Sequence, residues 1–311
     1  MDQLEPFQTN LTLHDADSMN NLAGKSNVPK LLSMTVQVER LSAFPFEGRG
    51  GNPAGVVLNG SELSDSTMQE IAAQVGYSET VFIAKSEGFR LRVRYFSPEM
   101  EVDFCGHATI AAGVALGEVH GPGEYVFETN TGEVIVRVSE NSTGIIAELT
   151  SSPGTVSELG GENLAMLLEI LGWQESVLAK DFAPSIANAG NSHPVLVLSS
   201  VEALQNLVYD FDALKLICRE YKWPTIQLVA EESPGVWQSR NPFAFGGVYE
   251  DPATGSAALA FGVYLRQTGK AQPGETFTIK QGFKMGQPCL LNVIVGADFC
   301  SVSGTAIRIV T

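Results

Sequence analysis

Two segments of this chain would form helices that are apolar on every side. They are ATIAAGVAL, residues 108–116, and SAALAFGVYL, residues 256–265. A helix without a polar face must be surrounded by protein, and both segments are far shorter than the roughly 20 apolar residues that cross a bilayer. Strands with a half-buried alternating pattern, such as MTVQVERLSAF at residues 34–44, are suited to wrap such helices. We therefore expect sheets curled around central helices.

The motifs in the first half of the chain recur in the second half in the same order. GGNPAGVVL precedes one predicted helix and AGNSHPVLVL another, and both apolar helices follow an arginine, a proline-containing turn, an acidic residue and a glycine. Asn52 and Asn191 are 139 positions apart, and Gly106 and Gly255 are 149 apart. A period of this length is too long for a solenoid and indicates two similar domains.

The predicted fold class is α+β, with two pseudo-symmetric lobes that each curl a sheet around a central apolar helix. We expect the first lobe to span residues 34–150 and the second residues 151–311, with the last strand, about 300–311, as a candidate to return to the first lobe. Residues 1–33 are rich in Asn, Asp and Ser and are predicted to be a partly ordered extension. The cleft between two such lobes, near the starts of both central helices, is the natural ligand site.

Composition excludes several classes of partner. The chain has 19 Lys and Arg against 35 Asp and Glu, a net charge of -16, which predicts no binding to nucleic acid or to an anionic membrane. The four cysteines lie far apart without CxxC spacing, so we expect no disulfide framework and a cytoplasmic location. The start of the chain has no apolar segment typical of a signal peptide.

The N-terminal ends of the two apolar helices, called helix mouths below, are predicted to bind an anion. Unpaired N–H groups and a partial positive charge at a helix N-terminus favour a carboxylate or phosphate. Gly106 and Gly255 let a ligand approach the backbone closely. The side chains expected in the same space are those of Cys105, His107, Thr109, Asp251, Thr254 and Ser256. Asp, Thr and Ser are also ordinary helix caps, but the matched pair of motifs favours a functional site over simple capping.

Cys105 has two interpretations. A thiol at a helix N-terminus can have a lowered pKa and act as an acid, base or nucleophile, whereas a buried cysteine without such a role is a small apolar residue. A metal site at Cys105 and His107 would need a further ligand, and His14, His120 and His193 do not stand at suitable spacing. We therefore expect no metal.

Glu79 stands in VGYSETVFIA, after a glycine that is predicted to end a helix beginning near Ser64. It directly precedes an apolar strand, where a carboxylate is costly unless it is paired or functional. It is therefore either a general acid or base or a solubilising charge at the strand edge.

Four motifs in order resemble the PhzF family of phenazine-biosynthesis-like proteins. They are AFPFEGRGGNPAGVVL, GYSETVFI, RYFSPEMEVDFCGHATIAAGVAL and EDPATGSAALAFGVYL, and the resemblance runs from about Met34 to the C-terminus. It implies the diaminopimelate epimerase fold of two α/β-roll lobes, an active site in the cleft between them, and a homodimer. The characterised phenazine enzyme isomerises trans-2,3-dihydro-3-hydroxyanthranilate by moving a proton, without a cofactor or a metal.

The resemblance also implies roles for particular residues. Glu79 matches the catalytic acid/base, His107 the residue that orients the substrate, and Asp251 the aspartate of the Asp-Pro-x-Thr-Gly-Ser motif. The residues implied in substrate binding are Asn52, Cys105, Gly106, Thr254, Gly255 and Ser256. The backbone amides at the two helix mouths would hold the substrate carboxylate, which agrees with the helix-dipole argument.

The epimerase relatives of this family use two cysteines, one at each helix mouth. Here Cys105 fills the first place, but Thr254 stands at the second, and a threonine does not ionise near neutral pH. A mechanism with two thiols is therefore excluded, and an isomerase with a single mobile carboxylate is the leading hypothesis. Two alternatives stay open: a thiol-dependent enzyme that uses Cys105, and a non-catalytic protein that acts through its acidic surface.

Overall fold

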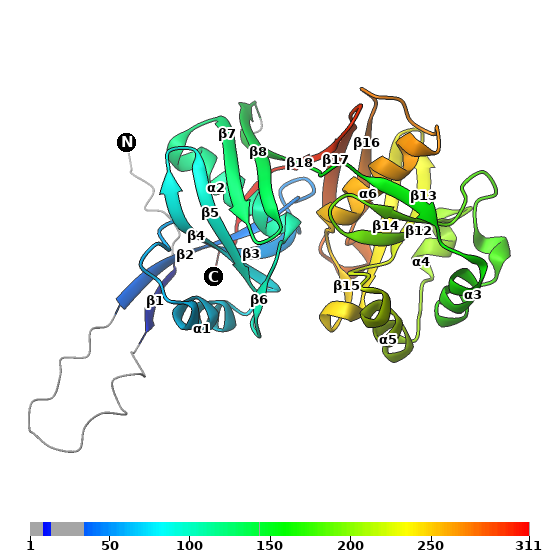
Figure 1. Ribbon diagram of the computed structural model, residues 1–311, viewed down its shortest axis with the longest axis horizontal. Coiled ribbons are helices and arrows are strands. Elements are labelled where there is room, and N and C mark those ends of the chain that lie inside the picture. Colours follow the sequence, from blue (N-terminus) through cyan, green and yellow to red (C-terminus); the bar gives the residue numbers. More distant parts are fainter. Residues whose placement is uncertain (1–8, 14–33, 143, 311) are drawn as a thin grey trace, which may run out of the picture.

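The computed structural model describes residues 9–13, 34–142 and 144–310. The elements form two lobes side by side, with the first half of the chain in one lobe and most of the second half in the other (Figure 1). The first half contains β1 (Thr9–Leu13), β2 (Met34–Ala43), β3 (Asn52–Val57), α1 (Asp65–Val75), β4 (Glu79–Glu87), β5 (Arg90–Phe96), β6 (Glu101–Val102), α2 (Gly106–His120), β7 (Gly123–Thr129), β8 (Gly132–Asn141) and β9 (Gly144–Thr150). The predicted extension thus contributes β1, which pairs with β2; the rest of residues 1–33 lies outside the described residues.

The second half begins with β10 (Thr155–Glu158), α3 (Gly161–Ile170), η2 (Glu175–Val177), β11 (Ser185–Asn188), β12 (Ser192–Val197), α4 (Val201–Gln205), α5 (Phe211–Tyr221), β13 (Gln227–Ser233) and β14 (Val236–Phe243). It continues with η3 (Ala244–Gly246), β15 (Val248–Asp251), α6 (Gly255–Gln267), β16 (Thr276–Gln281), η4 (Phe283–Met285), β17 (Cys289–Val295), β18 (Cys300–Gly304) and β19 (Ala306–Arg308). The mixture of sheets and helices is the α+β class expected from the sequence.

The strands pair in the same order in both halves. In the first, β2–β3 and β4–β5 are antiparallel, β3–β4 and β5–β7 are parallel, and β7–β8 and β8–β9 are antiparallel. In the second, β11–β12 and β13–β14 are antiparallel, β12–β13 and β14–β16 are parallel, and β16–β17 and β17–β18 are antiparallel. The internal repeat in the sequence therefore corresponds to a repeat in strand pairing.

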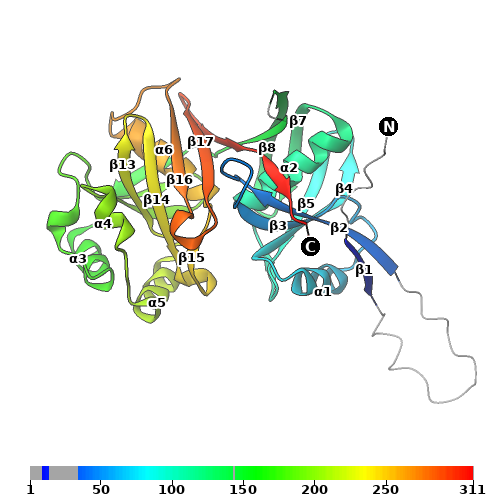
Figure 2. The same ribbon diagram turned by 180° about the vertical axis from the view of Figure 1, so that it is seen from behind.

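Two chain segments tie the lobes together. The last strands of the two repeats, β9 and β18, pair antiparallel, with Leu149 opposite Val302. The chain then exchanges partners: β10 follows β9 but pairs with β11, and β19 follows β18 but pairs with β2 in the first lobe. β18 runs between the two lobes, and Figure 2 shows the same crossing from behind.

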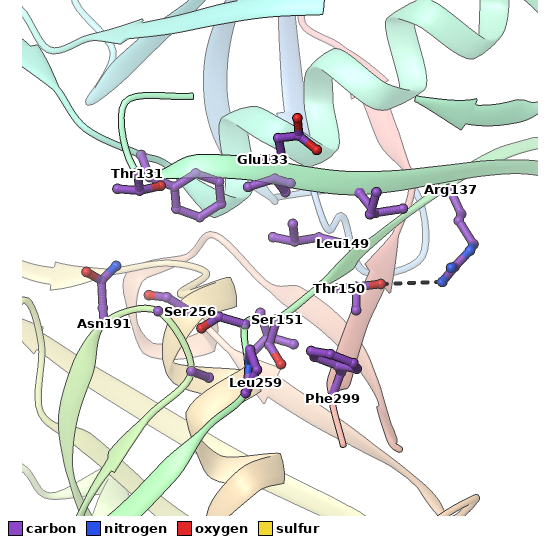
Figure 3. Close-up of a pocket in the computed structure, with 17 residues that line it drawn as sticks. Thr131, Glu133, Arg137, Leu149, Thr150, Ser151, Asn191, Ser256, Leu259 and Phe299 are labelled. Atoms are coloured by element: carbon purple, nitrogen blue, oxygen red, sulfur yellow. Dashed lines mark hydrogen bonds between the residues drawn. The ribbon is translucent and has the colours of Figure 1, made fainter. Parts of the chain in front are cut away.

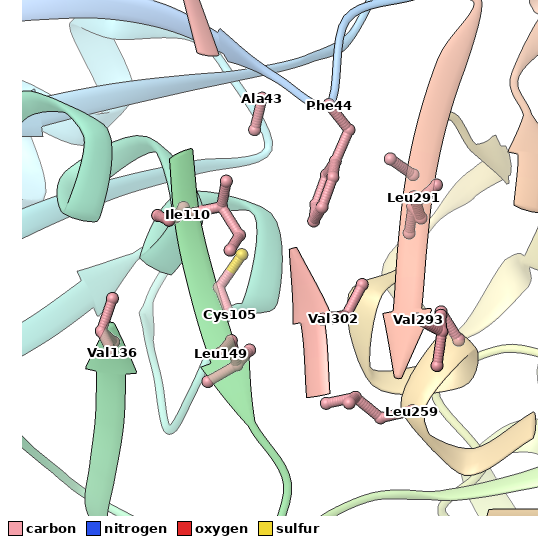
Figure 4. Packing of buried hydrophobic residues seen from close by; sticks show 14 of the residues in the cluster. Ala43, Phe44, Cys105, Ile110, Val136, Leu149, Leu259, Leu291, Val293 and Val302 are labelled. Carbon is pink, nitrogen blue, oxygen red and sulfur yellow. The ribbon is translucent and has the colours of Figure 1, made fainter. Parts of the chain in front are cut away.

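The helices α2 and α6 are enclosed by the sheets because small residues let the strands approach. All residues of α2 from His107 to Gly117 are buried. A side-chain carbon at Gly113 would lie 2.8 Å from the Cβ of Ala147 in β9, so only glycine fits at this contact. Figure 4 shows Ile110 of α2 and Leu259 of α6 in one cluster of buried apolar side chains that also includes residues of β8, β9, β17 and β18.

The helix α1 ends directly before the segment that carries Glu79. As the sequence predicts, Ser64 caps its N-terminus by accepting a hydrogen bond from the backbone N–H of Thr67, and Gly76 ends it with a φ of 72°. The chain can then turn directly into β4, whose first residue is Glu79. Among the described residues, no helix combines the length and the apolar character needed to span a membrane.

Candidate active site

The two helix mouths lie against each other. A side-chain carbon added at Gly106 would be 3.6 Å from the Cα of Gly255 and 3.6 Å from the backbone nitrogen of Ser256. The side chains of the N-cap residues Cys105 and Thr254 make no capping hydrogen bond to a backbone N–H of the helices they precede. The first N–H groups of both helices are thus free of side-chain caps, and two partial positive charges point toward one place. This arrangement favours a bound anion.

A small polar cavity of about 100 Å³ opens at the helix mouths. It is lined by eight of the ten residues that the sequence predicts at this site: Glu79, Cys105, Gly106, His107, Asp251, Thr254, Gly255 and Ser256. Asn52 contacts the cavity wall through Asp251, whose carboxylate accepts a hydrogen bond from the Asn52 side chain. The expectation for Thr109 is wrong, because its buried hydroxyl is bonded to Tyr95 and to the carbonyl oxygen of Cys105 and does not line the cavity. Residues from β4, β15, α2 and α6 are therefore brought to one point of the structure.

Glu79 and Cys105 both lie beside the imidazole of His107. Oε2 of Glu79 is 3.4 Å from Nε2 of His107, and the Cys105 Sγ is 3.3 Å from Nδ1. Oε2 of Glu79 has almost no exposed surface and lacks a partner with hydrogen-bond geometry. A buried carboxylate oxygen without a donor is costly, so the placement of Glu79 in the cavity wall points to an interaction with a ligand.

The Cys105 thiol does not have the lowered pKa considered from the sequence. Burial raises its pKa well above the usual value, and the nearby Glu79 carboxylate raises it further. Desolvation and a neighbouring negative charge both disfavour the thiolate and outweigh the effect of the helix N-terminus. Cys105 is therefore a neutral thiol in the free protein.

Asp251 is held by a network that crosses the two lobes. Its carboxylate accepts hydrogen bonds from Asn52 at 2.8 Å and from the Thr254 hydroxyl at 2.6 Å. Burial raises the pKa of Asp251 to about 6, against the opposing effects of His107 and of these hydrogen bonds. The side-chain amide of Gln281 donates to the Asp251 carbonyl oxygen at 2.7 Å and to the Thr254 hydroxyl at 3.0 Å. Thr254 and Asn52 thus fix the position of Asp251.

Ser256 is hydrogen-bonded to His193, which the sequence motifs do not predict at the site. Nε2 of His193 is 3.1 Å from the Ser256 Oγ, and Nδ1 is 3.1 Å from the carbonyl oxygen of Thr225. A carbonyl oxygen only accepts, so Nδ1 carries the proton, and burial keeps the ring neutral by lowering its pKa to about 4. The Ser256 hydroxyl therefore donates to Nε2.

A sequence signal for His193 existed. His193-Pro194 stands at the start of β12 as Asn52-Pro53 stands at the start of β3, and these strands occupy equivalent places in the two repeats. For Gln281, which lies in β16 far from every motif, there was no such signal. The expectation of no metal rested on the spacing of the histidines alone, whereas the structure brings the carboxylate of Glu79 beside Cys105 and His107.

A second, larger cavity of about 580 Å³ adjoins the polar one. The two share Phe104, Asn191 and Ser256 as lining residues. Its other walls come from β8 and β9 on one side and from Leu259 and Phe299 on the other, as Figure 3 shows. The walls combine apolar and polar groups, so a ligand anchored at the helix mouths has room to extend between the lobes.

Two repeated lobes, with a carboxylate and an imidazole at facing helix mouths, define a protein of the epimerase-like fold class. Residues 41–311 match the family described as phenazine biosynthesis-like protein, PhzC-PhzF. The chain belongs to this family, and the resemblance noted in the sequence is confirmed.

Relatives with known sequences and structures agree with this assignment. The uncharacterized isomerase YfhB of Bacillus subtilis is 31% identical over 262 residues, which are 81% of this chain and 87% of that protein. The trans-2,3-dihydro-3-hydroxyanthranilate isomerase of Pseudomonas fluorescens is 30% identical over 258 residues, or 82% and 88% of the two chains. The structure of a PhzF family protein from Bacillus anthracis has the same fold, with a TM-score of 0.78 at 24% identity over 89% of this chain and 97% of that chain. The enzyme class predicted from the sequence, an isomerase, agrees with these names.

Proposed function

We propose that this protein is an isomerase that moves a proton within a small carboxylate-bearing metabolite, with Glu79 as the acid/base and no cofactor. The observation that carries the proposal is the Glu79 carboxylate, which lines the cavity at the two helix mouths and whose buried Oε2 lacks a hydrogen-bond partner. The isomerase names of the relatives support the reaction class.

The substrate carboxylate binds at the N-terminal ends of α2 and α6. There the uncapped N–H groups and the two helix dipoles stabilise its charge. The same groups stabilise the additional negative charge that develops when a proton leaves a carbon conjugated to the carboxylate. The site is thus complementary to the anion formed during proton transfer and not only to the substrate.

Proton transfer proceeds through one carboxylate. Glu79 takes the proton from one carbon of the substrate, the double bond shifts, and Glu79 delivers the proton to another carbon on the same face. His107, 3.4 Å from Glu79, orients the substrate beside this carboxylate. Asp251, whose pKa of about 6 lies near neutrality, interacts with a polar substituent of the substrate.

Two features of the site oppose a mechanism based on thiols. Cys105 is neutral because burial raises its pKa, and Thr254 occupies the equivalent place at the other helix mouth. The larger cavity between the lobes accommodates the remainder of the substrate, and its mixed walls suit a molecule with both apolar and polar groups.

A screen of small carboxylates for deuterium uptake from heavy water tests the proposal, because proton transfer through Glu79 exchanges the label even without net conversion. Glu79→Gln should lower the exchange rate by about 100-fold or more, since general acid–base catalysis contributes at least this much. Carboxylate binding should be retained in this variant. Glu87→Gln, at the exposed end of the same strand, is the matched control. Unchanged exchange in Glu79→Gln would refute the assignment.

A further inference from the structure

Glu79, Cys105 and His107 present three different metal-binding atoms to one cavity. Their carboxylate, thiol and imidazole ligand atoms all lie within 4.8 Å of one another, and all three residues line the polar cavity. Glu79 is the first residue of β4, and the other two stand at the mouth of α2. Since both elements are packed into the buried core, the three side chains are held by rigid supports.

The spacing of these atoms is close to that of a tetrahedral zinc site. Zinc bonds of about 2.0 to 2.3 Å at tetrahedral angles put neighbouring ligand atoms about 3.3 to 3.6 Å apart. The Nε2 of His107 is 3.4 Å from Oε2 of Glu79 and 3.9 Å from the Cys105 Sγ. The ligand atoms of Glu79 and Cys105 lie within 4.8 Å of each other, so the thiol would approach both other ligands to complete the geometry.

One ligand atom of the site also lacks a hydrogen bond, although Nε2 of His107 lies 3.4 Å from it. Oε2 of Glu79 is buried without a hydrogen-bond partner, which a bound metal would satisfy. A set of one sulfur, one nitrogen and one oxygen suits Zn²⁺, whereas Mg²⁺ and Ca²⁺ prefer oxygen ligands alone. Three protein ligands beside a cavity leave the fourth position for water or a ligand group.

We propose that Glu79, Cys105 and His107 form a binding site for Zn²⁺ and related thiophilic divalent cations, and that the bound cation inhibits the enzyme. Binding replaces the thiol proton: the S–H bond breaks, a zinc–sulfur bond forms, and one proton passes to the solvent. The inhibition rests on the proposed function, because a Glu79 carboxylate bound to the metal cannot carry a proton.

The test titrates the full-length, chelator-treated protein with Zn²⁺ alone. Calorimetry in buffers of different ionisation enthalpy should show one cation bound with release of a proton. Co²⁺, used as a spectroscopic substitute, should give a charge-transfer band from a thiolate. Cys105→Ala and Cys105→Ser should both abolish this band and weaken Zn²⁺ binding by more than the roughly 100-fold that the loss of an outer-shell partner costs. The serine variant provides the test if the alanine variant does not fold.

Cys218→Ala is the control, because Cys218 is also buried but lies in α5 in a separate apolar cluster. Zn²⁺ binding that is absent, that is unchanged in the Cys105 variants, or that falls equally in Cys218→Ala would overturn the inference. The metal measurement does not need turnover. If no carboxylate exchanges deuterium but Zn²⁺ still binds in a way that depends on Cys105, the proposed function fails and the metal site stands.

Discussion

Asn52 of the first lobe and Asp251 of the second, 199 positions apart, are joined by a buried hydrogen bond of 2.8 Å. Asn52 also donates to the carbonyl oxygen of Ala253 at 3.1 Å, so one side chain holds two points of the segment that leads to α6. The contact connects the start of β3 to the mouth of the opposite helix. It therefore couples the relative position of the lobes to the position of a candidate catalytic carboxylate.

Asn52→Ala should destabilise the fold. The change leaves the Asp251 carboxylate with one hydrogen bond fewer in a buried place, which costs about 1 to 3 kcal/mol in the free energy of unfolding. Urea denaturation measures this difference. Asn59→Ala, at an exposed position after the same strand, should change it little. Equal stability of the two variants would show that the contact between the lobes does not contribute.

Asp251 should make stability depend on pH between about 4 and 6. Folding raises the pKa of its carboxyl from 3.8 to about 6, so the folded protein binds this proton more tightly than the unfolded chain. The contribution is complete below about pH 4 and is lost as the pH rises toward 6, by up to about 3 kcal/mol. The unfolding free energies of wild type and Asp251→Asn, measured by urea at several pH values, should diverge only within this range. A difference that is constant with pH would contradict the assignment.

A methyl group at the first helix mouth should weaken anion binding without harming the fold. In Gly106→Ala, the new carbon would make ordinary contacts of 3.6 Å with Gly255 and Ser256 and partly cover the amides at both helix ends. Binding of benzoate, followed by calorimetry, should fall about 10-fold or more while the melting temperature stays close to that of wild type. This loss corresponds to about 1.4 kcal/mol of binding energy.

Gly161→Ala is the control for the helix mouth, because Gly161 begins α3 and has open space around it. It should leave benzoate binding unchanged. Full benzoate affinity in Gly106→Ala would mean that carboxylates bind elsewhere.

Cys105 should react slowly with iodoacetamide. Burial and the Glu79 carboxylate raise its pKa, so the reactive thiolate is scarce near pH 8. Mass spectrometry should show alkylation of Cys105 slower than that of free cysteine, and Cys105→Ser should retain deuterium exchange. Fast alkylation that a carboxylate prevents, together with loss of exchange in the serine variant, would favour the thiol-dependent enzyme.

Several features of this protein are encoded in short stretches of its sequence. The two apolar helices, the Ser64 cap and the end of α1 at Gly76 are set by local patterns, and the repeated order of elements follows from a succession of such patterns. The motifs also identify most of the residues that line the polar cavity. These features are readable because helix periodicity, capping and glycine conformation act locally.

The tertiary structure alone decided how these residues act on one another. The approach of Glu79 to Cys105 and His107, the hydrogen bond from Ser256 to His193, and the bond from Asn52 to Asp251 join residues as far as 199 positions apart. No local pattern encodes such contacts, because they depend on how two curled sheets pack around their helices. The pKa of Cys105 shows this most clearly. A helix N-terminus lowers the pKa of a thiol, but burial in the assembled core raises it by more.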